Sequence, residues 1–241
     1  MTSVRKIIFG FFVALAALAF APQIAVAGTV VAVSGPSASQ YPVGTRLSGT
    51  QRVTLRQGDT LTVLHEGRTR TLRGPGTFVL AQRVPQGRNR ALAALTTRRS
   101  ASRARTGAVR GDGEGVANPN LWYVDVAQSG TVCLANSDPV RLWRAQTADA
   151  AVYTIARAGG TEDSVQLTFP EREMLAMWGS AVQLREGETY AISSAASQDT
   201  AQVRFVFLQE IPEDAEDLAL ALIENGCTVQ LEQMSAALAD S

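Results

Sequence analysis

Residues 64–78 read LHEGRTRTLRGPGTF and predict a β-hairpin followed by a turn. Glu66-Gly67 fits a two-residue hairpin loop, because glycine accepts a positive φ angle at such a position. Gly74-Pro75-Gly76-Thr77 has proline in second place and glycine in third, which is the preference of a type II turn. The predicted register pairs His65 with Arg68, Val63 with Arg70 and Leu61 with Leu72. One face of the hairpin therefore changes from apolar at its base to basic at an exposed tip.

The same stretch could instead be a catalytic or anion-binding loop, since it holds the only histidine of the chain and three arginines. A phosphate-binding loop needs successive backbone N–H groups, usually at the start of a helix. Pro75 has no N–H group, and a strand rather than a helix is expected after it. His65 has no visible partner set for acid–base catalysis. We therefore interpret the stretch as structural.

Residues 29–82 consist of short runs rich in Val, Thr and Leu, separated by Gly and Pro, which indicates an all-β module. Within it, residues 44–78 read GTRLSGTQRVTLRQGDTLTVLHEGRTRTLRGPGTF and resemble the FecR-type periplasmic β-domain. The matching positions are Gly44, Leu47, Gly58, Asp59, Leu72, Gly74, Pro75, Gly76 and Phe78. The resemblance implies a non-enzymatic β module of an envelope protein. It does not extend to the cytoplasmic segment and spanning helix of FecR-type regulators, so we do not expect signalling to a sigma factor.

The first 27 residues have the layout of a secretory signal peptide. Residues 1–6 carry two positive charges, residues 7–20 form an apolar run of 14 residues, and Ala25-Val26-Ala27 is a small-residue cleavage site with Ala25 and Ala27 at its key positions. Such a run is too short to span a bilayer comfortably, and a retained membrane anchor is the alternative. We expect cleavage after Ala27, export to the periplasm or the medium, and no stable transmembrane span in the mature chain.

Charge is divided unevenly along the mature chain. Residues 28–117 hold 14 arginines against four acidic residues, a net of +10, whereas residues 118–241 hold six arginines against 18 acidic residues, a net of −12. Such asymmetry suggests two modules.

Residues 85–117 form an arginine-rich connector, in which the spacing of Ala91, Leu92 and Leu95 predicts a short helix. The candidate residues for binding an anionic partner are Arg98, Arg99, Arg103 and Arg105. Pairing of this segment with the acidic second half of the chain is the alternative use of its charge.

Residues 118–210 contain nine strand-like runs, which predict a two-sheet antiparallel β-sandwich. We expect its core to contain Trp122, Trp143, Tyr153, Phe169, Trp178, Tyr190, Phe205 and Phe207. An aromatic binding patch is the alternative arrangement for these side chains.

Residues 211–241 predict a helical hairpin. Pro212 suits the first helical position, acidic residues follow in the first turns, and Asn225-Gly226 ends the first helix. A second helix is expected from about Val229 to Leu238. Cys227 lies between the helices, and Cys133 is the only other cysteine. Two cysteines in an exported protein predict a disulfide, with two buried free thiols as the alternative.

Few residue types for enzyme chemistry are present. The mature chain holds one histidine and no lysine, which excludes Ser-Lys dyads and sites that need two histidines, including the common zinc sites. We therefore predict no catalytic, metal-binding or cofactor-binding residues. The rival hypothesis is an envelope hydrolase that uses carboxylates such as Glu171/Glu173 or Glu186/Glu188, and a cleft with two inward carboxylates would favour it.

The sequence as a whole predicts a mainly β protein: a signal peptide (1–27), a FecR-like β module (28–84), an arginine-rich connector (85–117), a β-sandwich (118–210) and a C-terminal helical hairpin (211–241). The expected function is non-enzymatic binding or scaffolding in a bacterial envelope. An envelope protein or an anionic envelope polymer is the expected partner, and nucleic acid is not. A purely structural accessory whose modules pair with each other is a further alternative.

Overall fold

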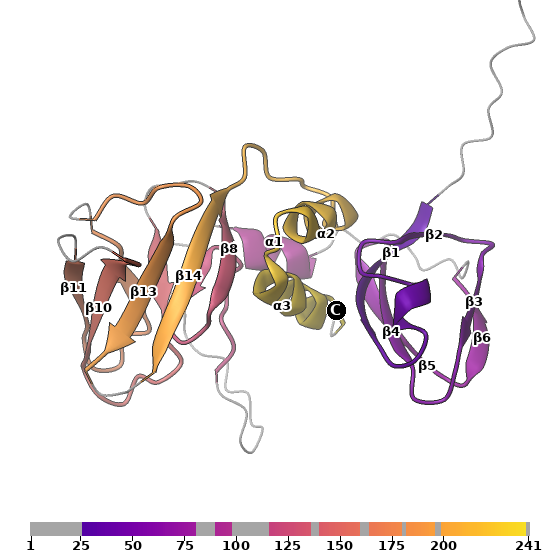
Figure 1. Ribbon diagram of the computed structural model, residues 1–241, viewed down its shortest axis with the longest axis horizontal. Coiled ribbons are helices and arrows are strands. Elements are labelled where there is room, and N and C mark those ends of the chain that lie inside the picture. The colour runs from indigo at the N-terminus through magenta and orange to yellow at the C-terminus, as the bar shows by residue number, and fades with distance from the viewer. Residues whose placement is uncertain are drawn as a thin grey trace, which may run out of the picture.

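The computed structural model describes residues 26–80, 90–97, 116–135, 140–159, 164–179, 182–195 and 199–239. Two β modules lie at opposite ends of the molecule, and three helices lie between them (Figure 1). The fold is mainly β with two C-terminal helices, as the sequence predicts. The residue limits predicted for the individual modules stay predictions. No helix in the described part of the chain is long and apolar enough to cross a membrane.

The first β module contains a four-stranded antiparallel sheet of order β2-β1-β4-β5 and a two-stranded ladder of β3 with β6. Its elements are β1 (Val26–Ser34), a 3-10 helix (Ala38–Gln40), β2 (Arg46–Ser48), β3 (Arg52–Leu55), β4 (Thr60–His65), β5 (Arg68–Arg73) and β6 (Gly76–Val79). The apolar core comprises Val30, Leu47, Val53, Leu55, Leu61, Val63, Leu72 and Leu80. In β3, Val53 and Leu55 are buried while Arg52 and Thr54 are exposed, which is the period-two pattern of a strand covered on one face.

The hairpin of β4 and β5 has the predicted register. His65 pairs with Arg68, Val63 with Arg70 and Leu61 with Leu72. Glu66 and Gly67 have φ angles of 48° and 72°, and positive φ at both central positions is the mark of a type I′ hairpin turn.

The type II turn predicted for residues 74–77 is wrong. The Gly74–Pro75 peptide bond is cis, and Gly76 lacks the positive φ angle that a type II turn requires at its third position. The chain still changes direction here, since β6 begins at Gly76 and returns to pair with β3.

Asp59 and Gly74, two of the positions that carry the FecR-type resemblance, both lie against the backbone of Arg56. The buried carboxylate of Asp59 accepts hydrogen bonds from the backbone N–H groups of Ser37, at 2.8 Å, and of Arg56. Burial opposes ionisation, but these hydrogen bonds and the nearby Arg56 charge lower the pKa of Asp59 below its ordinary value. A Cβ atom at Gly74 would lie 1.9 Å from the carbonyl oxygen of Arg56, so only glycine fits there. The residues that carry the FecR-type resemblance therefore include several that hold turns together.

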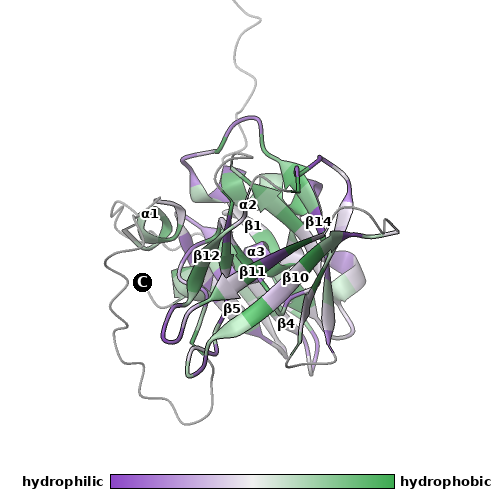
Figure 2. Ribbon diagram, turned by 90° about the vertical axis from the view of Figure 1, so that its left-hand side faces the viewer, coloured by the Kyte–Doolittle hydropathy of each residue, from purple (hydrophilic) through white to green (hydrophobic). Residues whose placement is uncertain are grey.

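The second β module is a sandwich of a five-stranded sheet, β11-β10-β13-β14-β8, and a three-stranded sheet, β12-β9-β7. Its strands are β7 (Tyr123–Asp125), β8 (Gly130–Leu134), β9 (Arg141–Trp143), β10 (Ala151–Arg157), β11 (Ser164–Phe169), β12 (Leu175–Met177), β13 (Thr189–Ser194) and β14 (Thr200–Phe207). Most neighbours are antiparallel, as predicted, but β8 runs parallel to β14 and β7 parallel to β9. Figure 2, which views the molecule from the sandwich end, shows hydrophobic and hydrophilic positions alternating along the strands.

The strand predicted for the run AVQLRE, residues 181–186, is wrong, because residues 182–186 form a loop. The Tyr190 hydroxyl accepts a hydrogen bond from the Arg185 N–H at 2.9 Å and donates to the Gln183 carbonyl at 3.0 Å. The indole N–H of Trp178 donates to the Val182 carbonyl at 2.9 Å. Side chains thus form the hydrogen bonds with these backbone N–H and C=O groups that a neighbouring strand would otherwise form.

Most of the predicted aromatic residues fill the sandwich core. The rings of Trp178, Tyr190 and Phe205 lie within 5.6 Å of one another, centroid to centroid, and meet edge to face or tilted. Trp122 is an exception, because it belongs to the core around the helices. All three tryptophans are at most 8% exposed, so the alternative of an exposed aromatic patch is wrong for them.

The helices are α1 (Arg90–Thr96), α2 (Ala215–Glu224) and α3 (Thr228–Ala239). Leu92 and Leu95 of α1 are buried, as their spacing predicts. The prediction that Pro212 takes the first helical position is wrong, because the Asp214 carboxylate caps α2 by accepting hydrogen bonds from its first N–H groups. The predicted helix end at Asn225-Gly226 is confirmed.

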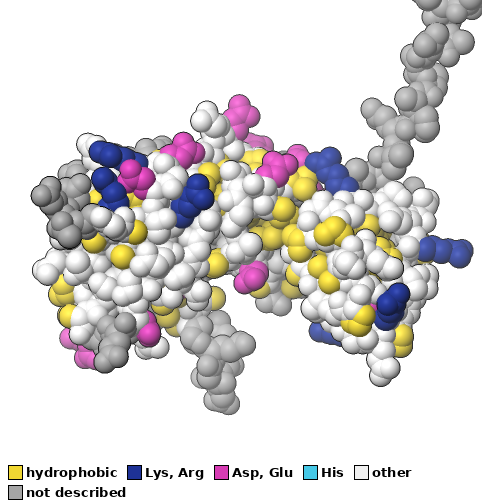
Figure 3. Space-filling model, in the orientation of Figure 1, with side chains coloured by type: hydrophobic (Ala, Val, Ile, Leu, Met, Phe, Trp, Pro, Cys, Tyr) yellow, Lys and Arg dark blue, Asp and Glu magenta, His cyan; other side chains and the backbone are white. Residues whose placement is uncertain are grey.

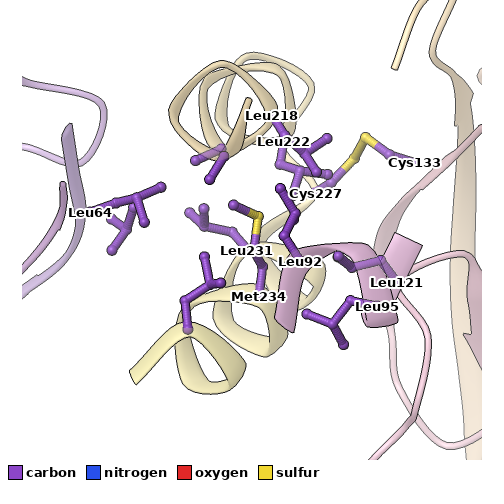
Figure 4. Close-up of a cluster of buried hydrophobic side chains, with 14 of the residues drawn as sticks. Leu64, Leu92, Leu95, Leu121, Cys133, Leu218, Leu222, Cys227, Leu231 and Met234 are labelled. Carbon is purple, nitrogen blue, oxygen red and sulfur yellow. A yellow bond between two sulfur atoms is a disulfide. The ribbon is translucent and has the colours of Figure 1, made fainter. Parts of the chain in front are cut away.

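The three helices share one apolar core with both β modules (Figure 4). The first module contributes Val31 and Leu64, and the second contributes Leu121, Trp122 and Cys133. The helices contribute Leu92, Leu95, Ala215, Leu218, Ala219, Leu222, Leu231, Met234 and Leu238. Because Leu64 follows the buried Val63, strand β4 is covered on both faces.

Hydrogen bonds also connect the first module to the C-terminal helices. The Gly67 N–H donates to the Glu216 carboxylate at 3.1 Å, and the Thr69 hydroxyl donates to the Ser235 carbonyl at 2.9 Å. Burial raises the pKa of Glu216 and the Asp214 charge adds to this, although the Gly67 N–H acts in the opposite direction.

A disulfide and one buried glutamine connect the helices to the sandwich. The predicted Cys133–Cys227 disulfide is confirmed, with Cα atoms 5.8 Å apart. The Gln230 side chain accepts a hydrogen bond from the Cys133 N–H at 2.6 Å and donates to the carbonyls of Leu121, at 2.7 Å, and Cys133, at 2.8 Å. Cys133 lies in β8, an edge strand, so Gln230 satisfies backbone groups that a further strand would otherwise pair.

Candidate functional site

Several residues singled out in the sequence fall outside the part of the chain that the structure describes. These are Ala25 and the candidate partner-binding residues Arg98, Arg99, Arg103 and Arg105. Ala27 lies in β1, next to Val26, which pairs with Ser48. Cleavage after Ala27 and the role of the four arginines stay predictions.

The tip of the β4–β5 hairpin is only partly exposed, since Glu66 and Arg68 are exposed but Gly67 between them is not. Gly67 is buried against α2, and His65 is half-buried at the end of β4. The tip lies against a helix because the Gly67 N–H binds Glu216. The stretch that first suggested an anion-binding or catalytic loop is therefore part of the contact between the first module and the helices.

The surface of the first β module is basic. We call its six exposed arginines the first-module arginines: Arg46, Arg52, Arg56, Arg68, Arg70 and Arg73. None of them forms an ion pair with a carboxylate of the described residues. Between residues 26 and 80 the acidic residues are the buried Asp59 and the exposed Glu66. On the face that Figure 3 shows, the first module carries basic groups, and the sandwich carries both acidic and basic groups.

One glutamate of each pair considered for a hydrolase forms an ion pair with an arginine. Glu171 forms an ion pair of 3.3 Å with Arg172, and Glu188 forms one of 2.7 Å with Arg157. Neither Glu171/Glu173 nor Glu186/Glu188 lines the large pocket of the sandwich.

That pocket has a volume of about 570 Å³ and lies where the ends of β10, β13 and β14 meet two loops, residues 126–129 and 144–150. Its charged and aromatic lining residues are Arg144, Asp149, Tyr153 and Asp199. Both aspartates are exposed, whereas Arg144 is 4% exposed and Tyr153 is half-buried. Much of the remaining wall is alanine, which leaves the pocket wide.

Arg144 is fixed by backbone oxygens and an aromatic ring. Its Nε donates to the Glu173 carbonyl at 3.0 Å and its Nη2 donates to the Pro170 carbonyl at 2.8 Å. The guanidinium carbon lies 5.1 Å from the centroid of the Phe169 ring. Tyr153 packs edge to face on the same ring at 5.3 Å. Phe169, which is fully buried, therefore positions both polar side chains of the pocket.

Arg144 and Tyr153 both keep N–H or O–H groups that no described residue accepts. Carbonyl oxygens do not neutralise a guanidinium charge, and among the described residues no carboxylate forms an ion pair with Arg144. Burial raises the pKa of Tyr153 and the Asp125 charge adds to this, although Arg144 opposes it. The Tyr153 phenol is therefore a neutral donor near pH 7.

Sequence reasoning missed this pocket, since its key residues are far apart in the chain. Arg144 follows β9, Tyr153 lies in β10 and Phe169 ends β11. One local feature of the sequence indicates a buried arginine: Arg144 directly follows the apolar residues Leu142 and Trp143 of β9, and all three are buried.

Comparisons with known proteins find no matching family model, no matching curated protein and no matching solved structure. The FecR-type resemblance of the first module therefore stays a hypothesis that rests on its turn and strand residues.

Proposed function

We propose that the protein is an exported, non-enzymatic binding or scaffold protein of a bacterial envelope, and that its first β module binds an anionic envelope polymer. The observation that carries this proposal is the set of six exposed first-module arginines without ion-pair partners among the described residues. A surface with a large excess of positive charge attracts a polyanion from a distance.

Two further features support an extracytoplasmic location. The N-terminal residues have the layout of a signal peptide, and a disulfide is the expected state of two cysteines in an oxidising compartment. The core shared by the helices and both modules supports a scaffold role, because it fixes the basic module at a set position relative to the sandwich.

The hydrolase alternative has weaker support. The large pocket does hold two carboxylates, Asp149 and Asp199, but both are exposed. An acid catalyst at neutral pH usually needs burial to raise its pKa. The glutamate pairs suggested by the sequence lie away from this pocket.

The proposal is tested by retention of mature protein, residues 28–241, on a polyanion resin at low and high salt. We expect retention at low salt that weakens as salt screens the charges. Replacing Arg68, Arg70 and Arg73 of β5 by Ser should remove much of it, and replacing Arg98, Arg99, Arg103 and Arg105 by Ser tests the connector. The control variant replaces Arg172 and Arg185 by Ser. These two arginines form ion pairs with glutamates of the sandwich, so their loss should not change retention on the resin.

Equal, weak retention of the wild type and the β5 variant at low salt would contradict binding by the first module. If the connector variant retains binding but unfolds more readily, the connector arginines pair internally with the acidic half of the chain. Stability changes within about 1 kcal/mol are expected for purely exposed arginines.

A further inference from the structure

The pocket of the sandwich has the features of a ligand site that is separate from the basic first module. Its volume of about 570 Å³ lies in the range of pockets that hold small organic molecules. Inorganic ions are much smaller than this space. The chemistry of the ligand follows from the groups that line the pocket.

Arg144 is the lining residue that most restricts the charge of the ligand. A guanidinium has five N–H groups, and the structure uses one on Nε and one on Nη2. Nη1 makes no hydrogen bond to any described residue, although the side chain is almost fully buried. A buried cation that carbonyls hold in place but do not neutralise favours an anion in the adjoining pocket.

Tyr153 adds a second donor beside the first. Its hydroxyl has no hydrogen-bond partner among the described residues, and its ring shares Phe169 with Arg144. A charged donor and a neutral donor in the lining of one pocket match the two oxygens of a carboxylate.

Two exposed aspartates of the pocket, Asp149 and Asp199, indicate which group the ligand carries opposite its carboxylate. Asp149 is exposed, lines the pocket and forms no ion pair with a described residue, and Asp199 lines the same pocket. These charges repel a dianion such as phosphate but attract an ammonium group. The alanine-rich wall, formed by Ala127, Ala148, Ala150, Ala151 and Ala201, leaves room for small side chains.

We propose that this pocket binds an amino acid or short peptide, with its carboxylate on Arg144 and Tyr153 and its ammonium group facing Asp149. This proposal does not rest on polyanion binding by the first module, which uses different residues at the other end of the molecule.

Titration calorimetry of disulfide-intact mature protein with the four stereoisomers of alanyl-alanine tests the proposal. At least one stereoisomer should bind in the micromolar to millimolar range. The same dipeptide with its C-terminal carboxylate converted to an amide should bind at least about tenfold more weakly than the free acid, since a charge-assisted hydrogen bond to the protein is lost. N-acetylation should also weaken binding, and free alanine shows whether a single residue suffices.

Three variants separate recognition from folding. Tyr153→Phe keeps the ring on Phe169 and should weaken binding about five- to tenfold, the value of one hydrogen bond. Asp149→Asn should weaken binding of the free dipeptide but not of its N-acetyl form. Arg144→Lys tests the guanidinium directly, and its melting temperature shows whether the loop that Arg144 holds is intact. Tyr41→Phe, which removes a phenol in the first module that accepts from the Thr54 N–H, is the matched control and should leave affinity unchanged.

The inference is overturned if no stereoisomer binds at concentrations up to about 10 mM, an affinity too weak for a built site. It is also overturned if the amide binds as well as the free acid, or if Tyr153→Phe binds like the wild type. Loss of polyanion retention by the first-module variant, with dipeptide affinity unchanged, would show that the two sites are independent.

Discussion

Replacing Gln230 by Met is expected to destabilise the protein strongly, although methionine fills nearly the same space. Gln230 is 4% exposed and makes three hydrogen bonds to the backbone of Leu121 and Cys133. The methionine variant would leave one N–H and two carbonyl groups buried without partners. The apolar side chain cannot satisfy them, and water has little access to this position.

The magnitude follows from these three groups. Each buried polar group without a partner costs about 1–3 kcal/mol, and carbonyls lie at the lower end because they tolerate imperfect bonding. Burial of the apolar methionine offsets about 1 kcal/mol of this cost. The expected loss of unfolding free energy is therefore about 2–5 kcal/mol. For a chain of this size the melting temperature should fall by about 5–15 °C.

Urea and thermal unfolding of the disulfide-intact protein measure this loss. The matched control is Gln233→Met, one turn along the same helix, where the half-buried amide makes a single hydrogen bond of 2.7 Å to the Asn118 carbonyl. The control should lose about 1 kcal/mol or less. A Gln230→Met variant that is no less stable than Gln233→Met would refute the idea that this glutamine satisfies the open edge of β8.

Three other perturbations have expected outcomes. Reducing the Cys133–Cys227 disulfide, whose cysteines are 94 positions apart, should lower the unfolding free energy by about 4–5 kcal/mol on a chain-entropy argument, and urea unfolding with and without reductant measures this. The raised pKa of Glu216 means that its contribution to stability is complete below its ordinary pKa and is lost as pH rises through the folded value. The stability of Glu216→Gln relative to the wild type should therefore increase as pH rises from about 4 to 7. The increase should be less than about 1 kcal/mol, because the carboxylate is partly solvated. A difference in unfolding free energy that does not change across this pH range would contradict the raised pKa of Glu216. Gly74→Ala should cost at least about 2 kcal/mol, because its Cβ would meet a backbone oxygen, whereas Gly179→Ala meets nothing within 4 Å and should be near neutral in the same melting experiment.

Local chemistry made much of the fold predictable from the sequence. Glu66-Gly67 determines the β4–β5 register because few residue pairs accept positive φ at two adjacent positions. Asn225-Gly226 marks the end of α2 for a similar local reason. The disulfide followed from the expected compartment and from the presence of two cysteines.

Contacts between distant segments were not predictable in the same way. The loop at residues 182–186 has strand-like composition, but side chains of Trp178 and Tyr190 bind its backbone. The Arg144 pocket depends on Phe169, 25 positions later in the chain. One signal was present, because the adjacent apolar residues Val63 and Leu64 break the alternation expected of a strand with one solvent face.

The position of the C-terminal helices has a consequence for how the chain reaches its final state. Gly67 and Glu216 are 149 positions apart, and Thr69 and Ser235 are 166 apart. During synthesis from the N-terminus, the first β module can fold before the rest of the chain is made. Its apolar face with Val31 and Leu64 is buried only when the C-terminal helices α2 and α3 pack against it. Loop closure over such separations is slow compared with hairpin formation. Assembly would therefore pass through a stage in which this apolar face is open, and a holding chaperone or dilute conditions should raise the yield of refolded protein.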